Sequence, residues 1–267
     1  MKAKWIGLLL LIVVALGAVG YVWFSQTTQV TEITGYVGGE KIGLLEDEQV
    51  QKILKDKYRL SLDYNRAGSI EMVTTLDRAG QDFLFPSNQT ALELFEREGG
   101  SPEKSQIVFN TPIVLYTHAA VAEALTAEGV FSQSGGVLTA DMEQLVALME
   151  SGAQWSDVGL PELYGSVTVG TTDPAKSNSG NMFAGLLANV LCGGSVGEED
   201  LPELLPRLQA LFQKLGYMES SSSDLFDQFL KTGMGAKPLI AGYESQLLEF
   251  AVQEPEVWSQ IQEDIVM

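Results

Sequence analysis

Strand-like apolar stretches alternate with helical patterns along most of this 267-residue chain, and this alternation limits the possible folds more than any other feature. Leu60, Leu62 and Tyr64 alternate with polar residues, as in a strand that is buried on one face. Between positions 204 and 215 the leucines recur at helical spacing. Because strands that alternate with helices form βαβ units, the sequence predicts an α/β fold with mixed, mainly parallel sheets.

The remaining elements are predicted from the same two periodicities. A long strand is predicted at 107–116, interrupted at Thr111-Pro112, and it is interpreted as crossing between two lobes because proline fits poorly inside a central strand. A helix over 138–149 is predicted to begin at a cap formed by Thr139. Further strands are predicted at 33–37, 82–85, 166–170 and 239–241, and further helices at 50–58, 181–191 and 222–230.

An uncharged apolar segment, WIGLLLLIVVALGAVGYVWF, occupies positions 5–24. Its length matches one helical span of a bilayer, and aromatic residues lie at both of its ends. Lys2 and Lys4 precede the segment and are expected to stay cytoplasmic, which places the rest of the chain on the extracytoplasmic side. The segment therefore predicts a single-pass membrane anchor. The alternative is a signal peptide cleaved near Ala18-Val19-Gly20.

Composition excludes several classes of function. A net charge of −19 and a pI near 4.3 argue against nucleic acid as a partner and against docking on anionic lipid through a basic patch. A single cysteine permits no internal disulfide, and one cysteine with one histidine, His118, provides no ordinary zinc site. No pair of carboxylates stands out as catalytic. The sequence therefore predicts no catalytic residue, no metal and no cofactor.

Four loops share one arrangement, in which a predicted strand is followed by a turn of small or hydroxyl-bearing residues and then by a helix start. Such loops lie at the carboxyl ends of strands in α/β sheets, where ligands bind, and helix N-termini offer free N–H groups to an anion. The loops are Gly38-Gly39-Glu40-Lys41, Gly68-Ser69, Ser87-Asn88 and Ser177-Asn178-Ser179-Gly180.

Each of these loops has a simpler interpretation, in which its serine or asparagine only caps the following helix. Residues 170–177 also resemble a phosphate-binding P-loop, but Ala175 stands where the second glycine belongs, and Pro174 has no N–H. Glu40, Lys41 and Arg66 could contact a ligand or lie on the surface, and the sequence does not decide between these roles.

The segment pattern resembles the type II periplasmic (extracellular) solute-binding proteins of ABC transport systems. This resemblance implies two α/β lobes with a ligand in the cleft between them, hinge closure near Thr111-Pro112, and an ABC permease as a possible partner. It also implies oxyanion-type binding residues: Gly39, Ser69, Ser87, Ser177, Asn178, Ser179 and Tyr243. The segments that carry it are 35–41, 65–71, 82–88 (DFLFPSN), 110–117 (NTPIVLYT), 171–181 (TTDPAKSNSGN) and 238–250 (PLIAGYESQLLEF).

The resemblance divides the chain into an anchor or signal segment at 1–25, a first lobe at 26–112 and a second lobe at 113–242. Residues 243–267 are expected to return toward the first lobe and to form only part of that return. The anchor lacks a lipid-attachment cysteine, which departs from a common pattern of the family.

These observations predict a membrane-anchored, extracytoplasmic protein that binds a small polar or anionic solute without catalysis, as part of an ABC-type uptake system. The alternative is a scaffold or sensor that has the binding fold but no transported ligand. An enzyme acting on envelope substrates is a further rival, for which His118 or an unidentified carboxylate would have to serve as the base.

Overall fold

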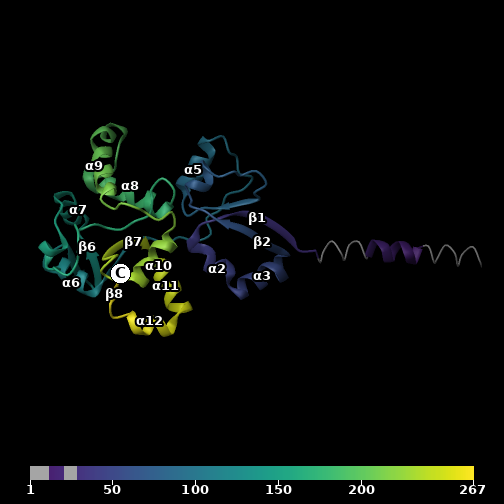
Figure 1. Ribbon diagram of the computed structural model, residues 1–267. Coiled ribbons are helices and arrows are strands. Elements are labelled where there is room, and N and C mark those ends of the chain that lie inside the picture. The colour runs from purple at the N-terminus through teal and green to yellow at the C-terminus, as the bar shows by residue number, and fades with distance from the viewer. Residues whose placement is uncertain (1–11, 21–28) are drawn as a thin grey trace, which may run out of the picture.

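The computed structural model describes residues 12–20 and 29–267. Two bodies are visible in Figure 1, each built around its own three-stranded sheet. We call the body around β1, β2 and β3 the first lobe and the body around β4, β7 and β8 the second lobe. The α/β class that the sequence predicts is confirmed.

The first lobe is a parallel sheet in the order β2-β1-β3, formed by β1 (Thr31–Val37), β2 (Leu60–Arg66) and β3 (Phe83–Phe85). Parallel neighbours need crossover connections, and α3 (Glu48–Tyr58) supplies the one between β1 and β2. β1 is the central strand, and a Cβ at its Gly35 would lie 2.4 Å from the Phe83 carbonyl oxygen. The other helices are η1 (Gly39–Lys41), α2 (Ile42–Glu46), α4 (Glu71–Thr74) and α5 (Gln89–Arg97).

The second lobe is organised around β4 (Ile113–His118), which pairs antiparallel with β7 (Leu239–Tyr243) and with β8 (Ile265–Val266). Every residue of β7 is buried, as expected for a strand covered on both faces. A single parallel bridge joins Gly170 to Ile240 on the far side of β7. The expectation of mainly parallel sheets therefore holds for the first lobe, whereas the named strands of the second lobe pair antiparallel.

Helices and one hairpin surround this second sheet. Its hairpin, β5 (Phe131–Ser134) and β6 (Val137–Ala140), turns at Gly135 and Gly136, whose φ angles of 62° and 84° favour glycine. The helices are α6 (Ala119–Ala127), α7 (Met142–Ser151), η2 (Trp155–Val158), α8 (Asn178–Cys192), η3 (Glu198–Asp200), α9 (Leu201–Gln213), α10 (Ser222–Thr232), α11 (Glu244–Gln253) and α12 (Pro255–Ile261).

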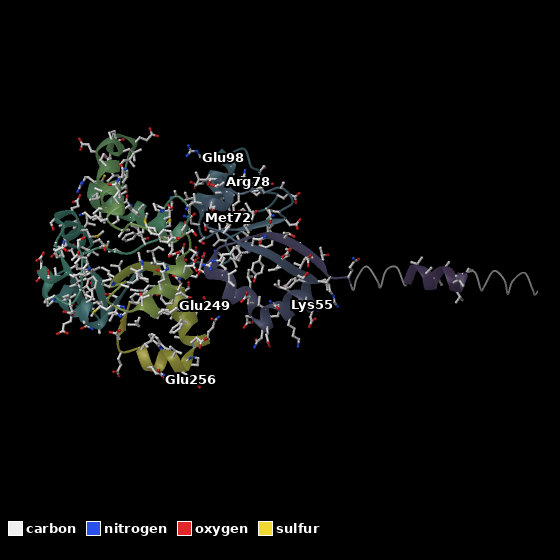
Figure 2. All side chains as sticks on the ribbon, in the orientation of Figure 1. Lys55, Met72, Arg78, Glu98, Glu249 and Glu256 are labelled. Atoms are coloured by element: carbon white, nitrogen blue, oxygen red, sulfur yellow. The ribbon has the colours of Figure 1, made fainter. Side chains whose placement is uncertain are left out.

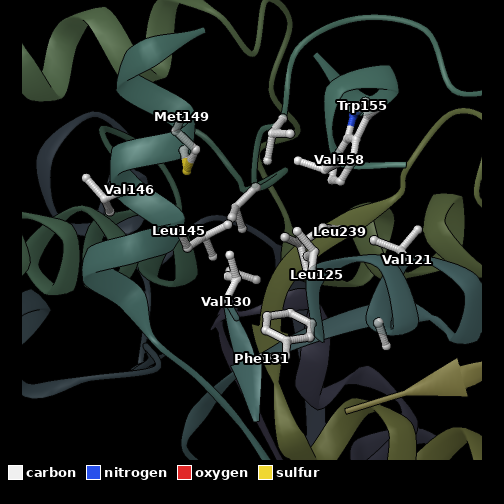
Figure 3. Close-up of a cluster of buried hydrophobic side chains, with 14 of the residues drawn as sticks. Val121, Leu125, Val130, Phe131, Leu145, Val146, Met149, Trp155, Val158 and Leu239 are labelled. Atoms are coloured by element: carbon white, nitrogen blue, oxygen red, sulfur yellow. The ribbon is translucent and has the colours of Figure 1, made fainter. Parts of the chain in front are cut away.

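The largest core cluster lies in the second lobe and includes Trp155, Leu125 and Leu145 (Figure 3). A second cluster, on the other face of the sheet, joins Tyr116, Phe226 and Phe229. The first lobe has a smaller cluster around Met72, Val73 and Ala91. The described apolar core is thus concentrated in the second lobe.

Three predicted elements differ from the structure. Residues 107–109 form no strand: Ile107 and Val108 are 62% and 65% exposed, and no described strand pairs with them. The helix predicted from Leu138 begins at Met142, where Asp141 caps it, because residues 137–140 belong to the hairpin. Residues 166–170 form only the two isolated bridges at Ser166 and Gly170.

The predicted membrane span at 5–24 lies largely outside the described residues. Within it, residues 12–20 are helical. In the described ranges, 12–20 and 29–267, no helix combines the length and apolar character that crossing a bilayer requires. The span and its alternative, a cleaved signal peptide, stay predictions.

The segment after Tyr243 contacts both lobes. α11 lies against the first lobe, since a Cβ at Gly43 would overlap the carboxylate of Glu249, and Figure 2 places Glu249 at the boundary of the two lobes. The chain then runs through α12 to β8, which pairs with β4 in the second lobe. The lobe boundaries at 112 and 242 stay predictions.

We expect Phe229→Ala to lower the free energy of unfolding by about 3–5 kcal/mol, because it empties a fully buried site. The Phe229 ring packs on those of His118, Tyr116 and Phe226. Urea unfolding followed by circular dichroism measures the change. Tyr164→Ala, at a side chain that is 99% exposed, is the matched control and should change it by less than about 0.5 kcal/mol. Equal losses for both variants would contradict the assigned core.

Candidate functional site

A small cavity lies where the two lobes meet. Its volume is about 10 Å³, near the least that holds one water molecule. Residues from both lobes line it: Gly38, Gly39, Glu40, Ala67, Gly68, Ser69 and Ser87 from the first, and Ser177, Asn178, Ser220, Ser221 and Tyr243 from the second.

The parallel sheet explains the first lobe's share of the lining. β1, β2 and β3 run in the same direction, so their carboxyl ends meet at one edge. Gly39 follows β1, Ser69 follows β2 and Ser87 follows β3. The Ser69 hydroxyl oxygen accepts a hydrogen bond from the Ser87 N–H at 3.0 Å, and the two hydroxyl oxygens are 3.1 Å apart. These bonds join the Ser69 and Ser87 loops, and the Gly38 N–H, which donates to the Phe85 carbonyl at 3.4 Å, connects the loop after β1 to the end of β3.

The second lobe contributes the starts of three helices. Ser177 is the N-cap of α8, Ser221 of α10 and Tyr243 of α11. The hydroxyls of Ser177 and Ser221 make no capping hydrogen bond to their own helices. Helix N-termini carry free N–H groups and a partial positive charge. The starts of α8 and α10 therefore favour a negative or strongly polar group there, whereas the first two N–H groups of α11 already donate to Pro112 and Thr111.

Six of the seven residues predicted to bind ligand line this one cavity: Gly39, Ser69, Ser87, Ser177, Asn178 and Tyr243. Ser179 does not line it. Its side chain is buried in the first turn of α8, where its hydroxyl lies 2.7 Å from Thr172 Oγ1 and 3.2 Å from Ser177 Oγ. Successive helical residues point in different directions, so Ser179 faces Thr172 while Asn178 faces the cavity.

Asn178 and Tyr243 form the polar wall on the second-lobe side. Asn178 Nδ2 donates to Tyr243 Oη at 2.7 Å, and both side chains are buried. Asn178 Oδ1 is also buried and has no partner among the described residues. Burial raises the pKa of the Tyr243 hydroxyl well above its ordinary value, and the charge of Glu40 raises it further. Tyr243 therefore stays a neutral hydroxyl.

The buried Lys41 forms a charged group with the partly buried Glu40 and Ser87 on the first-lobe side. Lys41 Nζ donates to Ser87 Oγ at 2.7 Å and pairs with the Glu40 carboxylate, which also accepts a hydrogen bond from Ser87. Burial by itself raises the pKa of Glu40. The charge of Lys41 and the hydrogen bonds from Lys41 and Ser87 outweigh it, so the pKa lies below its ordinary value of 4.5. Glu40 is ionised at neutral pH.

Direct contacts between the lobes flank the cavity. Arg66, at the end of β2, donates to Ser221 Oγ at 2.6 Å and to Ser223 Oγ at 2.7 Å, and it pairs with Asp224 at 2.7 Å. On the other side, the Ile70 N–H donates to the Lys176 carbonyl at 3.0 Å. Gly68 permits this approach, since a Cβ there would lie 2.3 Å from the same carbonyl oxygen. The structure is that of a closed cleft.

Sequence reasoning left Glu40, Lys41 and Arg66 undecided, and the structure places all three at or beside the cavity. The serine run at 220–223 was not among the candidate loops, although Ser220 and Ser221 line the cavity. The available signal was the similarity of this serine-rich helix start to the four loops already identified.

His118 and the lysine of the P-loop-like segment, which the sequence offered as candidate functional groups, do not line the cavity. His118 Nδ1 is 2.8 Å from Asp264 Oδ2, and its ring packs on Phe229 inside the second lobe. In the P-loop-like segment, Lys176 extends toward Asp173, 3.7 Å away, with an exposed side chain. Among the described residues, no group of three or more His, Cys, Asp or Glu side chains is arranged to hold a metal ion.

No family model matches the chain, and no curated protein matches its sequence. Solved structures similar to it include the sulfate-binding protein SubI from Mycobacterium tuberculosis H37Rv, at 14% identity and a TM-score of 0.48, covering 84% of this chain and 68% of that one. Another is the substrate binding domain of a protein assigned as a molybdenum ABC transporter from Clostridium difficile, at 12% identity and a TM-score of 0.42, covering 88% of this chain and 76% of that one. Both are solute-binding proteins of the kind that the sequence resembles.

The lowered pKa of Glu40 predicts a pH dependence of stability. A carboxyl group whose pKa is lower in the folded state stabilises the fold above its unfolded pKa, and this contribution is lost as the pH falls through the folded pKa. We expect the free energy of unfolding of Glu40→Gln to lack this component. The difference between wild type and Glu40→Gln should shrink as the pH falls from neutral to about 3, measured by urea unfolding. A difference that is constant or grows in acid would contradict the ionised, paired state of Glu40.

Proposed function

We propose that this protein binds a small polar or anionic solute in the cavity between its lobes and does not transform it chemically. The observation that carries this proposal is the meeting of the N-termini of α8 and α10, several hydroxyls and the buried Lys41 group at one interlobe cavity. Hydroxyls, N–H groups and helix starts together hold an oxyanion with few full positive charges.

The unpartnered Asn178 Oδ1 supports a binding role. A buried polar atom without a partner costs about 1–3 kcal/mol, so such an atom indicates a site that a ligand or water completes. The side-chain amide can present either its oxygen or its nitrogen, because Tyr243 Oη accepts and donates hydrogen bonds. Asn178 can therefore serve an acceptor or a donor on the solute.

Entry of a solute requires the lobes to separate, because the closed cavity holds about one water molecule. We propose a hinge near Thr111-Pro112, where the chain passes from the first lobe to β4. Here Thr111 Oγ1 accepts from the Ser245 N–H at 3.1 Å, and the Pro112 carbonyl accepts from the Glu244 N–H at 3.1 Å. These bonds tie the crossing point to the start of α11, next to Tyr243.

We further propose that residues 5–24 anchor the chain in a membrane with the lobes on the extracytoplasmic side, where they deliver solute to an ABC permease. The support for the anchor is the length and apolar character of the segment and the preceding lysines. The permease is the partner that the resemblance to solute-binding proteins of ABC transport systems implies. After carbonate washing of membranes, the full chain should remain in the pellet, and a variant lacking residues 5–24 should not. N-terminal sequencing of the protein from membranes is the second test. Cleavage near Gly20 would overturn the anchor.

A thermal-shift screen with sulfate, molybdate, tungstate, phosphate, amino acids and sugars tests the binding function. A ligand that binds only the folded state stabilises it by about 2.7 kcal/mol at 100 times its Kd. We expect a dose-dependent rise in melting temperature with one class of oxyanion. A well-folded sample that responds to none of these solutes would favour the scaffold or sensor role. Turnover of a bound solute would favour the enzyme.

Asn178→Asp tests the location of the site. The substitution keeps the side chain's shape but adds a negative charge at the cavity, so we expect anion binding to weaken roughly 100-fold in isothermal titration calorimetry. Asn181→Asp is the control, because it adds the same charge within the first turns of α8 but outside the cavity lining. It should bind within about twofold of wild type. Equal weakening in both variants would show a general charge effect and would contradict the assigned site.

A further inference from the structure

Lys41 is the only lysine or arginine among residues 12–20 and 29–267 that is buried, with 3% of its surface exposed. Its ammonium group lies 5.0 Å from the centre of the Phe85 ring and donates to Ser87. A desolvated ammonium group beside a hydroxyl is the strongest anion-binding element near the cavity, because electrostatic attraction is least screened there.

That element already holds an anion, the carboxylate of Glu40. One carboxylate oxygen of Glu40 accepts hydrogen bonds from both Lys41 Nζ and Ser87 Oγ. Glu40 also lines the cavity, whose remaining volume of about 10 Å³ is too small for a tetrahedral oxyanion. A ligand oxygen that reached Lys41 and Ser87 would have to take the place of this carboxylate.

The Glu40 side chain borders an adjacent space that it could occupy when it is displaced from Lys41. It also lines a second, more open groove of about 190 Å³ between the first lobe and helices α10 and α11. Gly43 and Phe250 border this groove as well, and so does Glu249. A rotation of the Glu40 side chain toward the groove would free Lys41 and Ser87 without unfolding any element.

We propose that the Glu40 carboxylate is an internal competitor for the ligand: it occupies Lys41 and Ser87 when the cavity is empty, and a small oxyanion displaces it toward the groove. This inference rests on the proposed function and names Glu40 as the group that sets the affinity of the cavity for its ligand. Two anions do not share one cation at close range without a large electrostatic cost. Ligand binding and the Glu40–Lys41 pair are therefore mutually exclusive.

The groove favours the return of Glu40 once the ligand leaves. Asp227 and Glu249 both border it, so a displaced Glu40 carboxylate would meet negative charge. The displaced state is thereby kept higher in free energy than the paired state. The apparent Kd of the ligand then equals its intrinsic Kd divided by the fraction of molecules in which Lys41 is free.

Titration calorimetry of the full chain and its Glu40→Gln and Glu40→Ala variants with sulfate, molybdate and phosphate tests this proposal. We expect both variants to bind the oxyanion at least about tenfold more tightly than wild type, since the competing charge is removed. Glu46→Gln is the matched control: it removes one negative charge from an exposed position at the end of α2 and should leave the Kd unchanged. Circular dichroism melts establish that each variant is folded.

The outcomes separate this proposal from the proposed function. Binding by the Glu40 variants that is tighter than wild type, or that occurs only in the variants, supports the competitor. Binding that is unchanged or weaker in the variants overturns it and leaves the anion-binding function in place. Weaker binding of hydrogen phosphate alone overturns it as well, because Glu40 would then accept a hydrogen bond from the P–OH group of the ligand and so contribute to binding it. Absence of oxyanion binding in all folded proteins, wild type included, overturns the competitor and the anionic-solute form of the proposed function.

Discussion

The close approach of the two lobes at Gly68 is the constraint on which the candidate site depends. The backbone beside this glycine lies so near the Lys176 carbonyl that a Cβ would overlap it, and the Ile70 N–H donates to the same oxygen. Arg66 makes the corresponding contacts with Ser221 and Asp224 on the other side. These contacts hold loops from three parallel strands against three helix starts. The cavity is therefore a product of two lobes, and neither lobe forms it alone.

Charge burial at this cavity has an energetic consequence. A buried ion pair recovers its desolvation cost only when its geometry and its additional hydrogen bonds are good. Ser87 supplies two such bonds, since its hydroxyl donates to Glu40 and accepts from Lys41. The pair is satisfied internally, whereas Asn178 Oδ1 across the cavity is not. In the empty cavity the charges of the Glu40–Lys41 wall are thus paired, whereas the opposite wall has an unpaired acceptor, Asn178 Oδ1. A ligand would gain a hydrogen bond at Asn178 and would have to compete with Glu40 for Lys41.

Much of this site can be predicted from sequence because of a general property of α/β sheets. Parallel strands end at a common edge, so residues as far apart as Gly39 and Ser87 can be placed together without knowing the contacts. The same reasoning cannot assign roles to Glu40 and Lys41, since burial of a charged pair depends on packing by the other lobe. Ser179 was assigned to the site through its neighbours in a loop, but the rotation of a helix turns it away.

In the fold as well, elements set by a local residue pattern could be predicted, whereas elements that depend on a distant partner or on a turn could not. The strong helical pattern at 204–215 and the alternating strand at 60–64 correspond to α9 and β2. The triplet at 107–109 has strand-like composition but gains no partner among the described strands, and strand formation depends on a partner. The hairpin at 131–140 depends on two consecutive glycines with positive φ, and the apolar pattern alone does not indicate it.

The central claim is that an oxyanion binds between the lobes, against Ser87, Asn178 and Tyr243. Crystals of the protein grown with selenate test it most directly, because anomalous scattering from selenium locates the anion independently of any assumed site. We predict one strong anomalous peak within hydrogen-bonding distance of those three side chains, with the Glu40 carboxylate moved away from Lys41. Peaks confined to the outer surface, with the cavity unchanged at millimolar selenate, would contradict it.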